Sequence, residues 1–295
     1  MLLAAGAAAP AGAQAASEAW QIVPQPQSSL VLARDGQLIG ELGAQLRVSV
    51  AIRSLPPYVA QAFIAVEDQR FYKHDGVDVV GMAAAFKDAL RGHARGASTI
   101  TQQLVGNMHP DLIDRADRSI ARKIHEQNAA REMERHYDKQ QILEAYLNQI
   151  HFGHGWYGIE EASRHYFGIP AAKLSLAQAA TLAALPKGPA LYDPVRHPDR
   201  ARERRDLVLS LMAQQGYLTA AAAVAAKAEA IVTAPGGGIS AAPYVVDLVR
   251  REAETNGIAI MDGGFQVTTT IDAQLLSLAA DALASGLARG EARAG

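Results

Sequence analysis

The feature that most constrains the fold is an almost unbroken helical pattern from Leu55 to about Gly216. Apolar residues recur there at helical spacing, and glycine or proline interrupts the runs, which marks the helix ends. Helices are expected at about 56–72, 79–91, 98–108, 117–136, 139–149, 158–167, 175–185, 199–215 and 219–230. The pattern therefore predicts a mainly α protein.

The flanking segments read differently. Residues 28–50 alternate apolar and polar side chains around Asp35-Gly36, which predicts a short β-hairpin. Residues 235–238 suit a linker. After it we expect a helix at 243–254, a strand at 265–271 and a helix at 273–287. This tail is too small for a core of its own, so we interpret it as the opening of a further domain. The expected segments are 1–20, 21–54, 55–232 and 233–295.

The composition limits the classes of function. The net charge of −2 gives no reason to expect a nucleic-acid partner, and the lack of cysteine excludes disulfides and thiolate metal sites. Residues 1–19 are rich in alanine and contain small-residue steps like those of signal-peptidase sites, but no basic start. We interpret residues 1–20 as an export or anchor segment, with a disordered leader as the alternative.

The first candidate functional stretch is 63–76, an apolar helical run that ends in a polar cluster. Glu67 comes late in that helix, where partial burial would raise its pKa and suit it to general acid or base catalysis. Gly76 can supply the left-handed residue that ends the helix. Taken alone, the stretch is explained more simply as a solvated helix end whose carboxylates pair with Arg70 and Lys73.

Two further stretches gather polar side chains on helices. Ser98 is a natural N-cap, and residues 99–103 place hydroxyls and amides behind it, so this helix start suits an oxyanion such as phosphate. Arg122 and Glu126 lie one helical turn apart, with Arg118 on the same stripe, and can grip an anionic substrate. Taken alone, a capped amphipathic helix and a surface ion-pair ladder explain both stretches.

Together these stretches resemble glycosyltransferase family 51, the peptidoglycan glycosyltransferase domain of class A penicillin-binding proteins. The matching motifs are Glu67-Asp68-x-x-Phe71-x-x-His74-x-Gly76, Gly96-Ala-Ser98-Thr99-Ile-Thr101-Gln102-Gln103-Leu-Val-x-Asn107, Arg122-Lys123-x-x-Glu126, Ile142-Leu-Glu144-x-Tyr146-Leu-Asn148 and Arg204-Arg205-x-x-Val208-Leu209-x-x-Met212. Five motifs in one order make the match specific. The resemblance implies a lysozyme-like, two-lobed helical domain over 55–232. Residues 233–295 would then be a linker and the start of a transpeptidase domain that the chain is expected to lack.

The resemblance also implies a reaction. Lipid II and the growing glycan strand would be substrates at the membrane surface, on the periplasmic face of the bacterial inner membrane. The acceptor 4-hydroxyl would attack the anomeric carbon of the donor, invert it and release undecaprenyl pyrophosphate. Glu67 would be the general base. Glu126 would assist departure of the pyrophosphate or stabilise oxocarbenium charge, with a divalent metal (Mg²⁺ or Mn²⁺) as the one cofactor suggested.

The same resemblance implies a substrate-binding set, within which Asp68, Phe71 and His74 would shape the site around Glu67. The residues of the set are Asp68, Phe71, His74, Ser98, Thr99, Gln102, Gln103, Asn107, Arg122, Lys123, Asn148 and Lys187. Residues 79–90 carry apolar side chains near one face, a region that lies by the membrane in the family, so we predict interfacial insertion. A buried core helix explains that periodicity equally well.

One residue departs from the family pattern. Gly106 stands where lysine is usual, so a contact to the donor pyrophosphate is expected to be lost, with His93, Arg95 or His109 as replacements. This leaves a weakened module that binds lipid II as an alternative function. Two carboxylates beside a glycosidic carbon also describe a lysozyme-like muramidase. The surrounding cations and hydroxyls favour transfer, because a pyrophosphate leaving group needs them.

Overall fold

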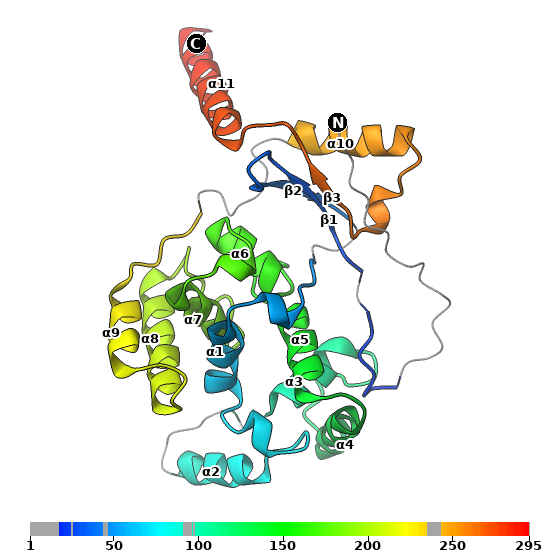
Figure 1. The fold of residues 1–295 in the computed structure, drawn as a ribbon, viewed down its shortest axis with the longest axis vertical. Helices are drawn as coiled ribbons and strands as arrows, with labels where there is room; N and C mark the ends of the chain where they lie inside the picture. Colours follow the sequence, from blue (N-terminus) through cyan, green and yellow to red (C-terminus); the bar gives the residue numbers. More distant parts are fainter. Residues whose placement is uncertain are drawn as a thin grey trace.

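The structure, a computed structural model, describes residues 18–24, 26–43, 47–90, 96, 98–234 and 243–294. Figure 1 shows a large helical lobe with a small sheet at one end, which confirms the predicted mainly α fold. The helices of the lobe are α1 (Pro57–Glu67), α2 (Val79–Leu90), α3 (Ile100–Met108), α4 (Ile120–His136), α5 (Lys139–Gln149), α6 (Ile159–Phe167), α7 (Leu176–Ala184), α8 (Pro198–Gln214) and α9 (Ala220–Ala228).

The core of the lobe is built around α1. This helix packs against α7 and α8, while α3 packs against α4 and α5. Phe63 of α1 is fully buried and meets the rings of Tyr146 and Phe152 edge-on, with centroids 6.3 and 6.0 Å apart. Pro57 opens α1 at a position where the missing N–H costs nothing. The apolar run that precedes Glu67 therefore anchors it to the centre of the lobe.

The loop after α1 differs from the prediction. The helix ends at Glu67 rather than near residue 72, because Asp68 adopts a non-helical backbone with φ −155° and ψ 77°. Residues 71–73 form a separate 3₁₀ turn. Gly76 does adopt a positive φ of 81°, but within the loop, where a Cβ would lie 2.5 Å from the carbonyl oxygen of Ala130. Only glycine fits this close approach between the loop and α4.

The small sheet joins the two ends of the described chain. Strands β1 (Ser29–Leu32) and β2 (Leu38–Leu42) form the predicted hairpin, and β3 (Gln266–Thr268) pairs with β1 in parallel. Helix α10 (Pro243–Thr255) covers the sheet, and Val245 and Val249 pack with Val31 in a second core. The tail was expected to lack a core; it shares one with the hairpin instead. Helix α11 (Ala273–Ala294) extends beyond the sheet (Figure 1).

Two contacts tie the lead-in segment to α5. Asn148 accepts the N–H of Val50 at 3.0 Å and donates to its carbonyl at 2.9 Å, while Glu144 accepts the N–H of Ile52 at 2.8 Å. Within the described ranges no helix combines the length and apolar character needed to cross a membrane. Residues 1–17, most of the predicted leader, lie outside the described part of the chain.

Candidate active site

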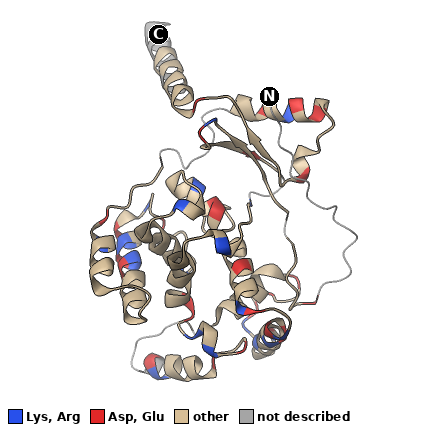
Figure 2. Ribbon diagram, viewed as in Figure 1, with Lys and Arg blue, Asp and Glu red and all other residues tan. Residues whose placement is uncertain are grey.

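A pocket of about 440 Å³ opens beside the end of α1. Its wall combines the end of α1, the pocket side of α2, the start of α3 and one face of α8. The polar and charged lining residues are Glu67, Asp68, Gln69, Arg70, Asp78, Ser98, Thr99, Lys187 and Arg204. Figure 2 shows lysine and arginine on α8 and in the loop after α1, so cations approach the pocket from two sides. Glu67 and Ser98, from different sequence motifs, both line this pocket.

Glu67 is a carboxylate of this pocket whose proton affinity is raised. Burial is the largest effect and raises the pKa of Glu67, and nearby Asp68 raises it further. A hydrogen bond from Gln103 Nε2 to Glu67 Oε2, 2.9 Å long, opposes the rise, as do the charges of Arg204 and Lys187. The balance leaves Glu67 a stronger base than an ordinary glutamate in water.

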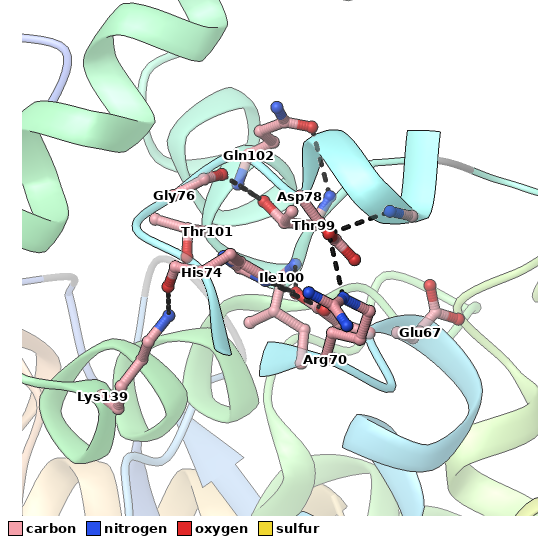
Figure 3. Close-up of polar contacts among 12 residues, drawn as sticks. Glu67, Arg70, His74, Gly76, Asp78, Thr99, Ile100, Thr101, Gln102 and Lys139 are labelled. Carbon is pink, nitrogen blue, oxygen red and sulfur yellow. Dashed lines mark hydrogen bonds and ion pairs between the residues drawn. The ribbon is translucent and has the colours of Figure 1, made fainter. Parts of the chain in front are cut away.

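Asp68 lines the pocket and also holds two neighbouring segments in place. Both of its oxygens lie 3.0 Å from His74 Nε2, and Oδ2 also accepts the backbone N–H of Ile100 at 3.0 Å (Figure 3). The carboxylate thus receives a free N–H at the start of α3, where negative charge is stabilised. This bond holds Asp68 in its non-helical conformation, so α1 ends at Glu67.

The loop that carries His74 is held in place by Lys139 of α5. Phe71 is fully buried, and the ammonium group of Lys139 lies 4.4 Å from the centre of its ring. Lys139 also donates to the carbonyl of His74 at 2.7 Å and pairs with Glu134 at 2.6 Å. Phe71 and His74 therefore support the loop from positions behind the residues that line the pocket.

The start of α3 is fixed by a capping box. The N-cap is Thr99 rather than the predicted Ser98: its hydroxyl accepts the N–H of Gln102 at 3.1 Å, and Gln102 Oε1 accepts the N–H of Thr99 at 3.2 Å. The Thr99 hydroxyl also donates to the carbonyl of Gly76 at 2.7 Å. Thr99 and Gln102 thereby hold the wall in place, while the Ser98 hydroxyl accepts a bond from Lys123 at 3.1 Å.

Glu126 is linked to the Ser98 hydroxyl through Lys123. It is buried, its Oε2 pairs with Arg122 and its Oε1 pairs with Lys123, which in turn reaches Ser98. The predicted grouping of these residues is present, but the lining of the pocket around Glu67 does not include Glu126. Because a cation already occupies each oxygen, Glu126 does not fit as the ligand of a divalent metal.

Gly106 makes room for an arginine. A Cβ at this position would lie 3.1 Å from Cδ of Arg115, whose guanidinium donates to Oδ1 of Asn107. Arg115 is therefore the cation that packs over the glycine. The suggested replacement His109 is buried and bonds the carbonyl of Gln21 at 2.7 Å. His93 and Arg95 lie outside the described residues.

Two motif residues, Asn148 and Arg204, have contacts that the sequence did not predict. Asn148, predicted to bind substrate, uses both amide groups on the backbone of Val50 and is absent from the lining of this pocket. Arg204, which matched a motif without a predicted role, lines the pocket beside Lys187 and rests over the ring of Tyr192 at 5.7 Å. Its buried Nε has no hydrogen-bond partner among the described residues, so it can donate to a ligand. The adjacent Arg204-Arg205 pair was the signal: Arg205 is buried, which leaves Arg204 for the pocket.

Known proteins share this sequence pattern. Residues 35–213 match a family described as transglycosylase. Penicillin-binding protein 1F of Bacillus subtilis is 38% identical over 88% of this chain and 37% of its own length. Penicillin-binding protein 1A of Aquifex aeolicus is 40% identical over 90% and 36%, and that of Escherichia coli 39% identical over 86% and 30%. The chain thus spans about a third of the length of these relatives.

Proposed function

The chain belongs to the transglycosylase family, and from that membership we propose that it is a peptidoglycan glycosyltransferase that polymerises lipid II in bacterial cell-wall synthesis. The observation that carries the proposal is Glu67, a carboxylate of raised pKa in a pocket that also presents Lys187 and Arg204. A base and a pair of cations in one cavity suit transfer of a sugar from a pyrophosphate carrier.

In the proposed reaction Glu67 removes the proton from the acceptor 4-hydroxyl. The oxygen attacks the anomeric carbon of the donor sugar, and the bond to undecaprenyl pyrophosphate breaks with inversion. Burial makes Glu67 basic enough for this task, and Gln103 fixes the orientation of its carboxylate. Asp68 and His74 hold the loop that follows, so the base is mounted on a rigid support.

The departing pyrophosphate needs positive charge. Lys187 and Arg204 line the pocket and can form charge-assisted hydrogen bonds to phosphate oxygens. Glu126 holds Arg122 and Lys123 as an ordered cationic pair behind Ser98. We therefore assign Glu126 a positioning role toward those cations. The scheme gives Glu126 no role as a metal ligand, because both of its oxygens are already paired.

A lipid-linked substrate suggests that the pocket meets the membrane surface. Val80 and Gly81 of α2 line the pocket, while Val79 and Phe86 of the same helix are 66% and 68% exposed. Exposed Ile120 adds apolar surface at the start of α4. Insertion of these side chains at the outer face of the inner membrane would bring the sugar and pyrophosphate to the pocket while the lipid tail stays in the bilayer.

The proposal is tested with labelled lipid II in detergent. We expect glycan strands from the native protein and none from Glu67→Gln, which keeps the shape of the side chain but not the base. Glu132→Gln is the matched control, because Glu132 pairs with Arg135 on the surface of α4 and is absent from the pocket lining. Polymer of unchanged yield from Glu67→Gln would refute the assigned base.

The same assay separates the alternatives. A module that only binds lipid II retains the label without forming polymer, and a muramidase releases soluble disaccharides from finished peptidoglycan. Either result from the native protein would overturn polymerisation. The presence of Lys187 and Arg204 in the wall beside Glu67 favours transfer from a pyrophosphate, since a neutral polysaccharide has no anionic leaving group.

A further inference from the structure

Three ionisable side chains meet at the junction between the sheet and the helical lobe. Glu41 comes from β2, and Glu161 and His165 come from successive turns of α6. One ligand atom from each lies within 4.8 Å of the others, the only such group of three among the described residues. The pocket beside Glu67 includes none of them.

The cluster is almost fully removed from water. The side chains of Glu41, Glu161 and His165 are 4%, 0% and 2% exposed. His165 Nε2 lies 2.7 Å from Glu161 Oε1 and 3.6 Å from Glu41 Oε1. Both oxygens of Glu41 and Oε2 of Glu161 have no hydrogen-bond partner among the described residues. Buried carboxylate oxygens without partners are costly, so these three point to a missing positive ligand.

Charge balance gives the valence of that ligand. Two carboxylates with a neutral imidazole carry −2, which one divalent cation cancels. The other charged groups of α6, Glu160 and Arg164, pair with each other at 2.7 Å, so they do not supply the balancing positive charge.

We propose that Glu41, Glu161 and His165 bind a divalent transition-metal cation of the zinc type, which fastens β2 to α6. One imidazole nitrogen with two carboxylates is a donor set that suits Zn²⁺, Co²⁺ or Mn²⁺ better than Mg²⁺. Bonds of about 2.1 Å place tetrahedral ligands about 3.3 Å apart, so the present 2.7 Å contact opens slightly when the cation enters.

The supports of the site are rigid. The ring of His165 stacks on Trp156 with centroids 4.5 Å apart and planes within 3°. All residues of α6 are buried, and β2 is held by its pairing with β1. The cation therefore joins two ordered elements of different parts of the fold, and α6 lies at the end of the lobe nearest the sheet (Figure 1).

The test uses the whole chain, freed of metal by chelation, with Zn²⁺ titrated against a chromophoric chelator. We expect binding of one Zn²⁺ per chain that is weakened about tenfold or more in Glu41→Gln and in His165→Asn. Glu160→Gln is the matched control: it is a buried carboxylate of the same helix whose oxygens bond Arg164 and the N–H of Ala171, each at 2.7 Å. Glu160→Gln and Glu67→Gln should leave the affinity unchanged.

Two further measurements use only the native protein, so they do not require that any variant folds. Zn²⁺ should slow hydrogen exchange of the β2 amides, and Co²⁺ should give a hyperfine-shifted imidazole N–H resonance from a single histidine. No stoichiometric binding of Zn²⁺, Co²⁺ or Mn²⁺, or equal affinity in all four variants, would overturn the site. Polymerisation of lipid II is not read in either experiment, so failure here is distinct from failure of the proposed function.

Discussion

Gln103 Nε2 of α3 donates a 2.9 Å hydrogen bond to Glu67 Oε2 at the end of α1. The amide cannot easily turn over, because its Oε1 accepts the hydroxyl of Tyr146 at 3.3 Å. A residue on one helix thus sets both the orientation and the basicity of a carboxylate on another. The bond opposes the effect of burial on the pKa of Glu67.

Replacing Gln103 by Leu should raise the pKa of Glu67, because the bond stabilises the charged form. The bond favours the ionised carboxylate, so its loss makes the proton harder to remove. Since the base acts when ionised, the acidic limb of the pH–rate profile for polymerisation should move upward. Tyr146→Phe, which keeps the bond to Glu67, should move it less. An unmoved limb in Gln103→Leu would contradict the role.

Loss of Lys187 or Arg204 should weaken the hold on the pyrophosphate. Each →Ala variant is expected to lower kcat/KM for lipid II by about tenfold, in line with one charge-assisted hydrogen bond. Lys173→Ala, a change at an exposed lysine that the pocket lining does not include, serves as control. Equal values of kcat/KM in all three variants would remove these cations from the site.

Asp68→Ala should destabilise the fold as well as the site. The change leaves His74 Nε2 and the N–H of Ile100 without their buried acceptor, at a cost of about 3 kcal/mol. Urea denaturation followed by circular dichroism measures it. Asp114→Ala, which removes an exposed acceptor of the Ala116 N–H, should cost much less. A stability equal to that of the native protein would show that the Asp68 bonds are unimportant.

Exchange of Val79 and Phe86 for serine should reduce binding to vesicles of phosphatidylglycerol and phosphatidylethanolamine. Burial of each apolar side chain contributes about 1.5 kcal/mol or more, so partition should fall at least about tenfold. Val224→Ser alters a side chain of α9 with similar exposure, 67%, and should bind normally. Equal sedimentation of all variants with vesicles would place the membrane contact elsewhere.

Arg115 should contact the donor pyrophosphate in place of the lysine expected at position 106. Arg115→Ala is predicted to lower kcat/KM for lipid II by about tenfold. Gly106→Lys alone should give no gain, because a Cβ there would lie 3.1 Å from Arg115 Cδ and the added ammonium would compete with the arginine for the same space. Combining both changes should restore activity. A gain from Gly106→Lys alone would instead support the weakened binding module.

Much of the helical lobe could be predicted from local signals. The capping boxes at Thr99, Asp138 and Ser175 and the positive φ of Gly168 explain why the predicted helix ends lie within a few residues of the observed ones. The apolar run before Glu67 likewise indicated a carboxylate that would be partly buried. These features depend on neighbours along the chain.

The errors arose where distant residues compete. Asp68 left α1 because Ile100, 32 residues away, offers an unpaired N–H. Asn148 lies on the expected helix but bonds Val50, 98 residues away, so its motif did not predict its contacts. The arginine that packs over Gly106, Arg115, comes from the loop after α3 and could not be read from the motif itself.

The sequence by itself determined the helices, the hairpin and the position of Glu67 at the end of an apolar helix, because propensity, capping and periodicity act over a few residues. Only the tertiary structure decided that β3 pairs with β1 and that Glu41 meets Glu161 and His165. It also decided that Gln103 bonds Glu67. Such contacts depend on how buried surfaces pack, and no local pattern encodes which of many polar groups will share one dry cavity.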